Sequence, residues 1–142
     1  MLKGIPNILS PELLRIMMEM GHGDELVLAD GNFPAASMAQ RLVRADGHGV
    51  PELLDAILRF FPLDTFVEQP VALMQVVPGD DTVPEIWDRY REIIRERAGD
   101  GFGVEEVERF AFYDRSRQAC SIVATGESAL YANIILKKGV VV

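Results

Sequence analysis

The feature that most constrains the fold of this chain is a series of short apolar runs bounded by turn residues. Residues 26–29 (Leu-Val-Leu-Ala) form an unbroken apolar run that is too short for a helix. Such a run is typical of a strand that is covered on both faces, as in a layered α/β sheet. Comparable runs predict four further strands, at residues 41–45, 71–77, 121–125 and 133–136, and an alternation of apolar and polar residues predicts a sixth strand at 104–109.

Helical patterns alternate with these strands. A Ser-Pro-Glu sequence at residues 10–12 begins a helix, because serine can cap it, proline suits the first turn and glutamate complements its positive end. Gly21 ends that helix, a second one opens at Pro51, and two more are predicted at residues 84–98 and 110–118. Because no change of composition and no long-period repeat divides the chain, residues 1–142 are expected to form one domain.

Charge and cysteine content exclude several classes of protein. The net charge is −8 and the isoelectric point is about 4.7, which argues against nucleic acid or an anionic membrane as partner. No apolar segment approaches the roughly 18 residues of a membrane span, and the first residues lack the apolar core of a signal peptide. The single cysteine, Cys120, lies in an apolar run and is expected to be a buried small hydrophobe. A lone thiol suits a reducing compartment, so a cytoplasmic location is expected.

Residues 21–34 surround the first predicted strand with polar groups in glycine-flanked turns. His22 precedes the strand and Asp30 follows it, so the two should lie at its opposite ends. An imidazole can both give and take a proton at neutral pH, which makes His22 a candidate for acid–base chemistry. Asp24 lies two residues further on and could accept a hydrogen bond from the ring. His48 has similar flanking residues, and composition does not rank the two histidines.

Several kinds of site are missing from the sequence. There is no pair of histidines at i and i+4, no histidine–cysteine cluster, no glycine-rich phosphate loop and no Gly-x-Ser-x-Gly motif, and residues 80–81 (Asp-Asp) sit in a plain turn. What remains are polar residues near the ends of apolar strands, where α/β sheets bind ligands. They are Asp30, Asp64, Arg109, Tyr113, Tyr131 and Asn133. Each alone is equally compatible with a turn cap or a surface ion pair.

Motifs spread over nearly the whole chain carry a family resemblance. They occupy residues 2–6, 9–14, 20–25, 29–34, 44–47, 109–113 and 125–139. On these segments the chain resembles the family of small sugar mutarotases that includes fucose mutarotases and ribose pyranases. The resemblance implies a three-layer α/β/α fold around a roughly six-stranded mixed sheet, with no cofactor and no metal. It also implies a monosaccharide substrate and a ring-shaped homo-oligomer, a decamer in bacterial members, with sites near subunit contacts.

The resemblance also assigns roles to residues. It makes His22 the proton-transferring residue, with Tyr113, Tyr131 or a water molecule as its partner. The positions that match sugar-contacting residues of the family are Asp30, Arg109, Tyr131, Ala132 and Asn133. Asp64 and Tyr113 match positions that are implicated in the function of the fucose mutarotases, one of the two branches of the family. His48 has no counterpart role.

Three positions distinguish the branches of this family. The ribose branch has histidine in place of Arg109, lacks the tyrosine at Tyr113 and has threonine in place of Gly23. The sequence therefore predicts an enzyme that interconverts the anomers of L-fucose or a related monosaccharide by opening and closing the sugar ring. Two alternatives stay open: interconversion of ribose pyranose and furanose forms, and a non-catalytic sugar-binding module.

Overall fold

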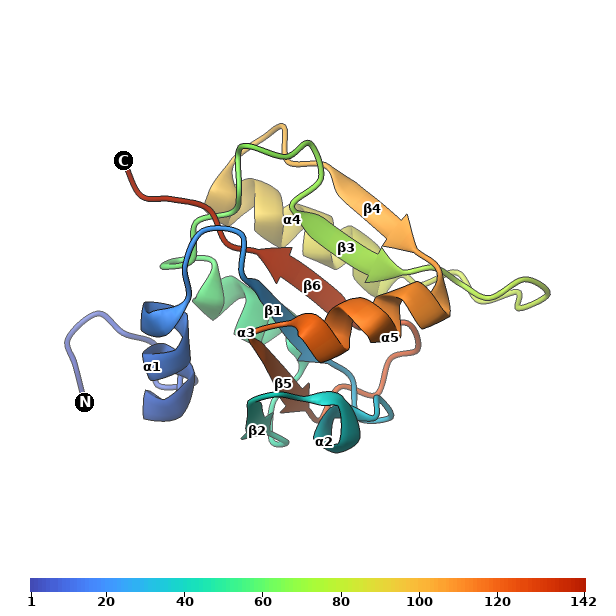
Figure 1. Ribbon diagram of the computed structural model, residues 1–142, viewed down its shortest axis with the longest axis horizontal. Coiled ribbons are helices and arrows are strands. Elements are labelled where there is room, and N and C mark those ends of the chain that lie inside the picture. The colour runs from blue at the N-terminus through green and yellow to red at the C-terminus, as the bar shows by residue number, and fades with distance from the viewer.

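A computed structural model describes residues 1–142 and shows strands and helices alternating along the chain (Figure 1). Six strands form one sheet in the order β2-β5-β1-β6-β3-β4. Their bounds are β1 (Glu25–Ala29), β2 (Leu42–Ala45), β3 (Val71–Met74), β4 (Val104–Val107), β5 (Ser121–Thr125) and β6 (Ile134–Lys137). All six correspond to the runs from which strands were predicted.

The direction of the strands gives the sheet two unlike edges. β6 is antiparallel to both of its neighbours, β1 and β3, whereas the pairs β1–β5, β2–β5 and β3–β4 are parallel. In Figure 1 the arrowheads of β3 and β4 accordingly point the opposite way to that of β6. Strands β1 to β5 therefore end at one edge of the sheet, called here the carboxyl edge, and β6 begins there. The opposite edge is called the amino edge.

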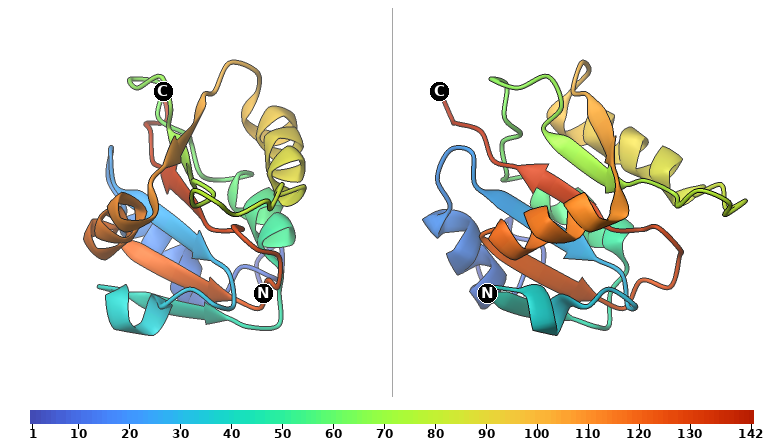
Figure 2. Two further views of the ribbon diagram at one scale, coloured as in Figure 1. Left: turned by 90° about the vertical axis from the view of Figure 1, so that its right-hand side faces the viewer. Right: turned by 45° about the vertical axis from the view of Figure 1, so that its right-hand side comes forward.

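Helices cover both faces of the sheet and make three layers (Figure 2). They are α1 (Pro11–Glu19), α2 (Ala35–Met38), α3 (Val50–Ile57), α4 (Ile86–Ala98) and α5 (Arg109–Gln118). The central strand β1 shows how both faces are used: Leu26 and Leu28 pack in the core with α1, α3 and α4, whereas Val27 and Ala29 pack with α2 and α5. Both faces of β1 are buried, which explains why its sequence is an unbroken apolar run.

Local sequence signals set the limits of the helices. Ser10 Oγ accepts a hydrogen bond from the Leu13 N–H at 3.1 Å at the start of α1. Gly99, with φ of 102°, ends α4 in a conformation that favours glycine. On α5, Arg115 donates to Glu25 of β1 at 2.5 Å and to Glu105 of β4 at 2.6 Å, and so ties the helix to two strands.

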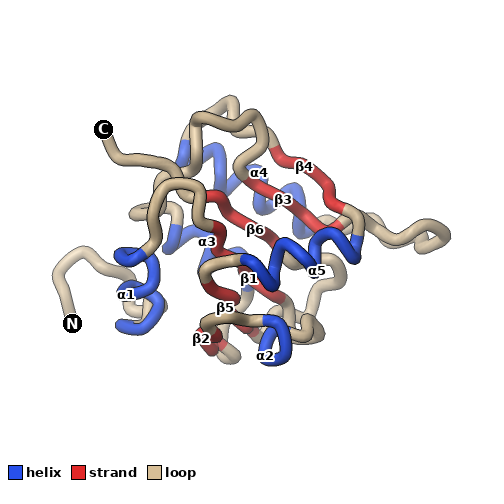
Figure 3. The backbone as a smooth tube through the Cα atoms, viewed as in Figure 1, coloured by secondary structure: helices blue, strands red, loops and turns tan.

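Several boundaries differ from those predicted, and one helix was not predicted. β3 ends at Met74 instead of residue 77, because residues 75–85 leave the sheet as a loop containing Pro78 and Gly79 (Figure 3). β4 ends at Val107, since the Glu108 carboxylate accepts hydrogen bonds from the next N–H groups and opens α5 one residue earlier than predicted. The short helix α2 was not predicted, because four residues are too few to show a helical period.

None of the helices combines the length and apolar character that a membrane span requires.

Candidate active site

The sheet divides the predicted site residues between its two edges. His22 lies before β1 and Asp30 directly after it, as expected. Because a strand rises about 3.3 Å per residue, the five residues of β1 extend over roughly 16 Å between the two edges. Asn133 precedes β6 and Arg109 follows β4, so both share the carboxyl edge with Asp30.

A buried pair of side chains, Asp30 and Asn133, forms the centre of the carboxyl edge. The Asp30 N–H donates to Asn133 Oδ1 at 2.8 Å, and Asn133 Nδ2 donates back to Asp30 Oδ2 at 3.0 Å. The Asn32 N–H donates to the other carboxylate oxygen at 3.0 Å. Burial raises the pKa of the Asp30 carboxyl, although these hydrogen bonds oppose the shift. The pair joins the end of β1 to the start of β6 across 103 residues of sequence.

Arg109 and Tyr113 lie one turn apart at the start of α5. Arg109 Nε donates to Tyr113 Oη at 3.2 Å, and the guanidinium carbon lies 5.5 Å from the centre of the tyrosine ring. Phe33, three residues after Asp30, packs edge-on against Tyr113 with ring centres 5.6 Å apart. Since the Tyr113 oxygen accepts from Arg109, its own O–H remains available to a ligand.

Residues 131–133 approach the same edge in an unusual backbone conformation. Tyr131 has φ of 55° and is the one non-glycine residue with positive φ. Two donors from α4 hold the strained segment, because Trp87 Nε1 donates to the Tyr131 carbonyl and Tyr90 Oη to the Ala132 carbonyl, each at 2.7 Å. Ala132 is fully buried, so its part in the site is to carry the backbone.

His22 and Asp64 form a second polar cluster, at the amino edge. His22 Nε2 lies 3.0 Å from Asp64 Oδ1, which also accepts from the Phe66 N–H at 3.0 Å. The pKa of the Asp64 carboxyl lies below its ordinary value. The hydrogen bond from the Phe66 N–H is the largest cause and the hydrogen bond with the His22 ring adds to it, whereas burial opposes the shift. Phe66 also packs against His22, with ring centres 5.1 Å apart.

Neither Asp24 nor His48, the two other candidates near a glycine-flanked turn, takes part in the His22–Asp64 contact. Asp24, which the sequence suggested as the partner of the His22 ring, accepts from the Gly21 N–H at 2.7 Å, and Asp64 takes its place. The second histidine, His48, has similar flanking residues, but its Nδ1 atom lies 3.4 Å from Oε1 of the exposed Glu52. Local spacing did not show the Asp64 contact, because 42 residues separate it from His22.

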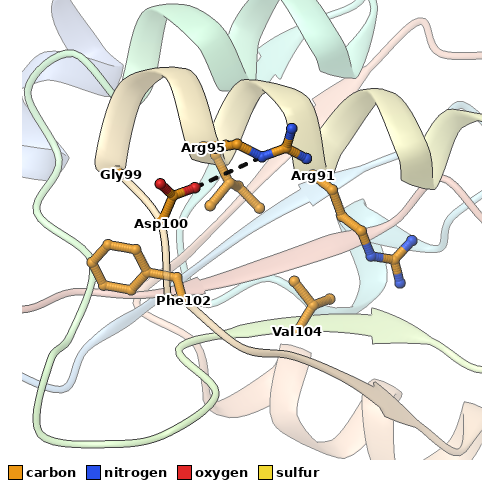
Figure 4. Close-up of a pocket in the computed structure, with 8 residues that line it drawn as sticks. Arg91, Arg95, Gly99, Asp100, Phe102 and Val104 are labelled. Atoms are coloured by element: carbon orange, nitrogen blue, oxygen red, sulfur yellow. Dashed lines mark ion pairs between the residues drawn. The ribbon is translucent and has the colours of Figure 1, made fainter.

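Two hollows lie near the sheet. One adjoins Asp30 and is lined by residues that include Ser37, Arg44, Asp46 and Thr125. The other lies between the end of α4 and the start of β4, where Arg95 approaches Asp100 at 3.9 Å (Figure 4). This second hollow contains none of the predicted site residues. No three histidine, cysteine, aspartate or glutamate side chains are grouped so that they could hold a metal ion.

Comparison with known proteins decides the family. Residues 3–141 match the RbsD / FucU transport protein family. The chain belongs to this family. It is 52% identical to the fucose mutarotase of Homo sapiens over 145 residues, which cover 98% of this chain and 94% of that protein. It is 54% identical to the L-fucose mutarotase of Actinobacillus pleuropneumoniae serotype 5b (strain L20) over 140 residues, which cover 99% and 97% of the two chains.

Solved structures agree with the sequence comparison. The crystal structure of the fucose mutarotase from Streptococcus pneumoniae in complex with L-fucose matches with a TM-score of 0.95 and 55% identity, covering 99% of this chain and all of that one. Bacillus subtilis RbsD complexed with D-ribose matches with a TM-score of 0.76 and 20% identity over 94% of this chain and 95% of that one. The second match shows a shared fold. The three-layer architecture expected from the resemblance is therefore confirmed.

Proposed function

We propose that this protein is an L-fucose mutarotase, an isomerase that interconverts the α and β anomers of the sugar. The observation that carries the proposal is the near-complete structural match to a fucose mutarotase whose crystal structure contains L-fucose. The carboxyl edge supports it, since Asp30 and Asn133 present a carboxylate and an amide to hydroxyl groups and Arg109 supplies charged donors. The sugar needs no cofactor for this reaction, which is acid–base chemistry.

The active site is composite, because the proton-transferring histidine and the sugar-holding residues lie at opposite edges of one chain. Each edge also carries an exposed aromatic side chain: Phe66, 73% exposed, beside His22, and Phe110, 66% exposed, next to Arg109. Exposed aromatic side chains rimmed by polar groups are typical of protein–protein contacts. A second copy of the chain would bring its amino edge to the carboxyl edge of the first.

Such a contact joins two different surfaces, and contacts of this type close into rings when the rotation permits. A ring-shaped homo-oligomer, a decamer as in bacterial members of the family, is therefore the proposed assembly. Light scattering on the purified protein measures its mass. The cytoplasmic location stays a prediction, based on the single thiol of Cys120.

The mechanism moves two protons in each direction. One group takes the proton of the anomeric hydroxyl while a second gives a proton to the ring oxygen. The bond from C1 to the ring oxygen then breaks, the aldehyde rotates about C1–C2, and the reverse transfers close the ring on its other face. His22 can serve in either direction, and Tyr113 is its proposed partner because its O–H is free for a ligand. Arg109 stabilises negative charge that develops on oxygen.

The first test is His22→Ala. Saturation-transfer NMR on L-fucose measures anomer exchange, and we expect the catalysed rate to fall by about 10²–10⁴-fold, which is the usual contribution of a positioned acid or base. His48→Ala is the matched control, since the imidazole of His48 lies beside the exposed Glu52 and not beside Asp64, and the variant should exchange anomers like the wild type. Exchange at the wild-type rate in His22→Ala contradicts the assignment of this histidine.

The same assay decides between the alternatives. A sugar-binding module would shift the fucose signals without accelerating exchange. A ribose pyranase would act on D-ribose in preference to L-fucose. The ribose alternative has the weaker support, because the ribose complex shares only 20% identity with this chain whereas the L-fucose complex shares 55%.

A further inference from the structure

The Tyr131 hydroxyl is held from outside the predicted site, by the loop that follows β3. Tyr131 Oη donates to Asp80 Oδ2 at 2.5 Å, and the Val77 N–H donates to the same hydroxyl oxygen over a longer 3.4 Å. Residues 75–85, which carry both partners, project beyond the carboxyl edge in Figure 1. From the sequence, Asp80 was placed in a plain turn with no further role, because 51 residues separate it from Tyr131.

The Asp80 carboxylate is itself fixed. Its Oδ1 accepts from the Thr82 N–H at 2.9 Å and from Thr82 Oγ1 at 2.6 Å, which leaves Oδ2 for Tyr131. The Thr82 side chain, and then Tyr131, hold the pKa of Asp80 below its ordinary value, so the carboxylate stays ionised at neutral pH. An ionised carboxylate can only accept hydrogen bonds, and it therefore keeps the Tyr131 proton turned toward itself.

A count of hydrogen bonds shows what Tyr131 can offer a ligand. A tyrosine hydroxyl has one donor and two acceptor sites. Asp80 uses the donor and Val77 uses one acceptor, so one lone pair is left. Tyr113 is in the opposite state, since it accepts from Arg109 and keeps its proton to give. The two tyrosines at the carboxyl edge thus have opposite hydrogen-bonding polarity.

We propose that Asp80 is a positioning residue that turns the Tyr131 O–H away from the sugar, so that Tyr131 meets the sugar only as a hydrogen-bond acceptor. The inference rests on the proposed function and narrows it, because Tyr131 is then excluded as the group that protonates the ring oxygen. Tyr113 keeps that role. Tyr131 is held at both its backbone and its hydroxyl group. Trp87 donates to its carbonyl in the strained backbone, and Asp80 accepts from its hydroxyl.

Asp80→Asn is the decisive variant, since it is isosteric and reverses the polarity of this contact. The amide oxygen keeps the bond from the Thr82 N–H, and the amide nitrogen then faces Tyr131 and donates to it. The Tyr131 oxygen loses its free lone pair, so we expect KM for L-fucose to rise about tenfold with a smaller change in kcat. Asp81→Asn is the control, because the neighbouring carboxylate makes no contact with Tyr131, and it should keep the wild-type KM.

Tyrosine titration gives a readout that a purely structural role would not move. The Asp80 hydrogen bond raises the pKa of Tyr131, while Arg109 opposes the shift. In a Tyr113→Phe background only Tyr131 should ionise in the accessible range, because burial raises the pKa of Tyr90, the third tyrosine of the chain, far above its ordinary value. Adding Asp80→Asn should move the ultraviolet tyrosinate transition to lower pH.

A double-mutant cycle measures whether the effect of Asp80 on KM depends on the Tyr131 hydroxyl. If Asp80 acts through Tyr131, then Asp80→Asn should raise KM no further in a Tyr131→Phe background. A wild-type KM in Asp80→Asn, or an unmoved tyrosinate transition, overturns the proposal. Failure of the proposed function is distinguishable, because wild-type protein would then not accelerate anomer exchange at all while the tyrosinate titration would still report on the Asp80 contact.

Discussion

At the scale of single residues, the pairing of His22 with Asp64 decides which ring nitrogen is open for the proton transfer that we propose. Nε2 lies against a carboxylate that is 3% exposed and held by a backbone N–H, so Nδ1 is the nitrogen left for a ligand. A buried carboxylate bonded to one ring nitrogen fixes the orientation of the imidazole. In the proposed mechanism Asp64 therefore acts on the sugar through His22.

Asp64→Asn tests this relation. The variant keeps the shape of the side chain and the oxygen that accepts from the Phe66 N–H, but it removes the negative charge beside the His22 ring. We expect kcat for anomer exchange to fall about tenfold, with little change in the dissociation constant of L-fucose, because the sugar hydroxyls are held at the other edge. Asp100→Asn, at an exposed position far from both clusters, is the control. A variant with unchanged kcat and weaker sugar binding would make Asp64 a direct sugar ligand.

The residues of the site were predictable in part. Glycine-flanked turns at the ends of an apolar run placed His22 and Asp30 correctly, and the family resemblance raised His22 above His48. The sequence did not show the partners of the site residues. Asp64 for His22 and Asp80 for Tyr131 come from 42 and 51 residues away, and such contacts depend on how the chain folds back and leave no trace in local spacing.

At the scale of elements, the strands were predictable because both faces of the sheet are buried. Unbroken apolar runs at β1, β3 and β5 need no alternation to be recognised. The loops that leave the carboxyl edge were not predictable in the same way, since tertiary contacts shape them. The loop after β5 is an example: the Gly126 N–H donates to the His48 carbonyl at 2.9 Å, and the loops after β2 and β5 touch there.

Gly126→Ala should disturb that loop. A methyl group at Gly126 would lie 2.0 Å from the Asp46 carbonyl oxygen, so the backbone must shift. We expect the free energy of unfolding to fall by about 1–3 kcal/mol, as in other overpacked sites. Sugar binding should also weaken, because a shift at Gly126 would be passed along the same loop to Asn133, the proposed sugar contact. Gly47→Ala is the matched control, since nothing lies within 4 Å of its added methyl group. Urea unfolding and fucose titration measure both effects, and equal behaviour of the two variants contradicts the argument.

At the scale of the whole molecule, the sheet separates the candidate site residues into two groups. β1 lies between the His22 cluster and the Asp30 cluster, and so holds them at opposite edges of the sheet within one chain. Each cluster borders an exposed aromatic side chain, Phe66 or Phe110. In the assembly that we propose, these exposed side chains are where a neighbouring copy would make contact.

Mixing two inactive variants tests whether one site uses two chains. His22→Ala leaves the carboxyl edge intact, and Asn133→Ala leaves the amino edge intact, so each pure variant should lack catalysed anomer exchange. In mixed oligomers formed from equal amounts, about a quarter of head-to-tail contacts would pair an intact His22 with an intact Asn133. We expect refolding the mixture to restore about that fraction of the wild-type rate, as measured by saturation-transfer NMR. Refolding each variant alone is the control. A mixture with no more activity than the separate variants would mean that each chain works with its own His22, and it would require the two edges of the sheet to serve the sugar in another way.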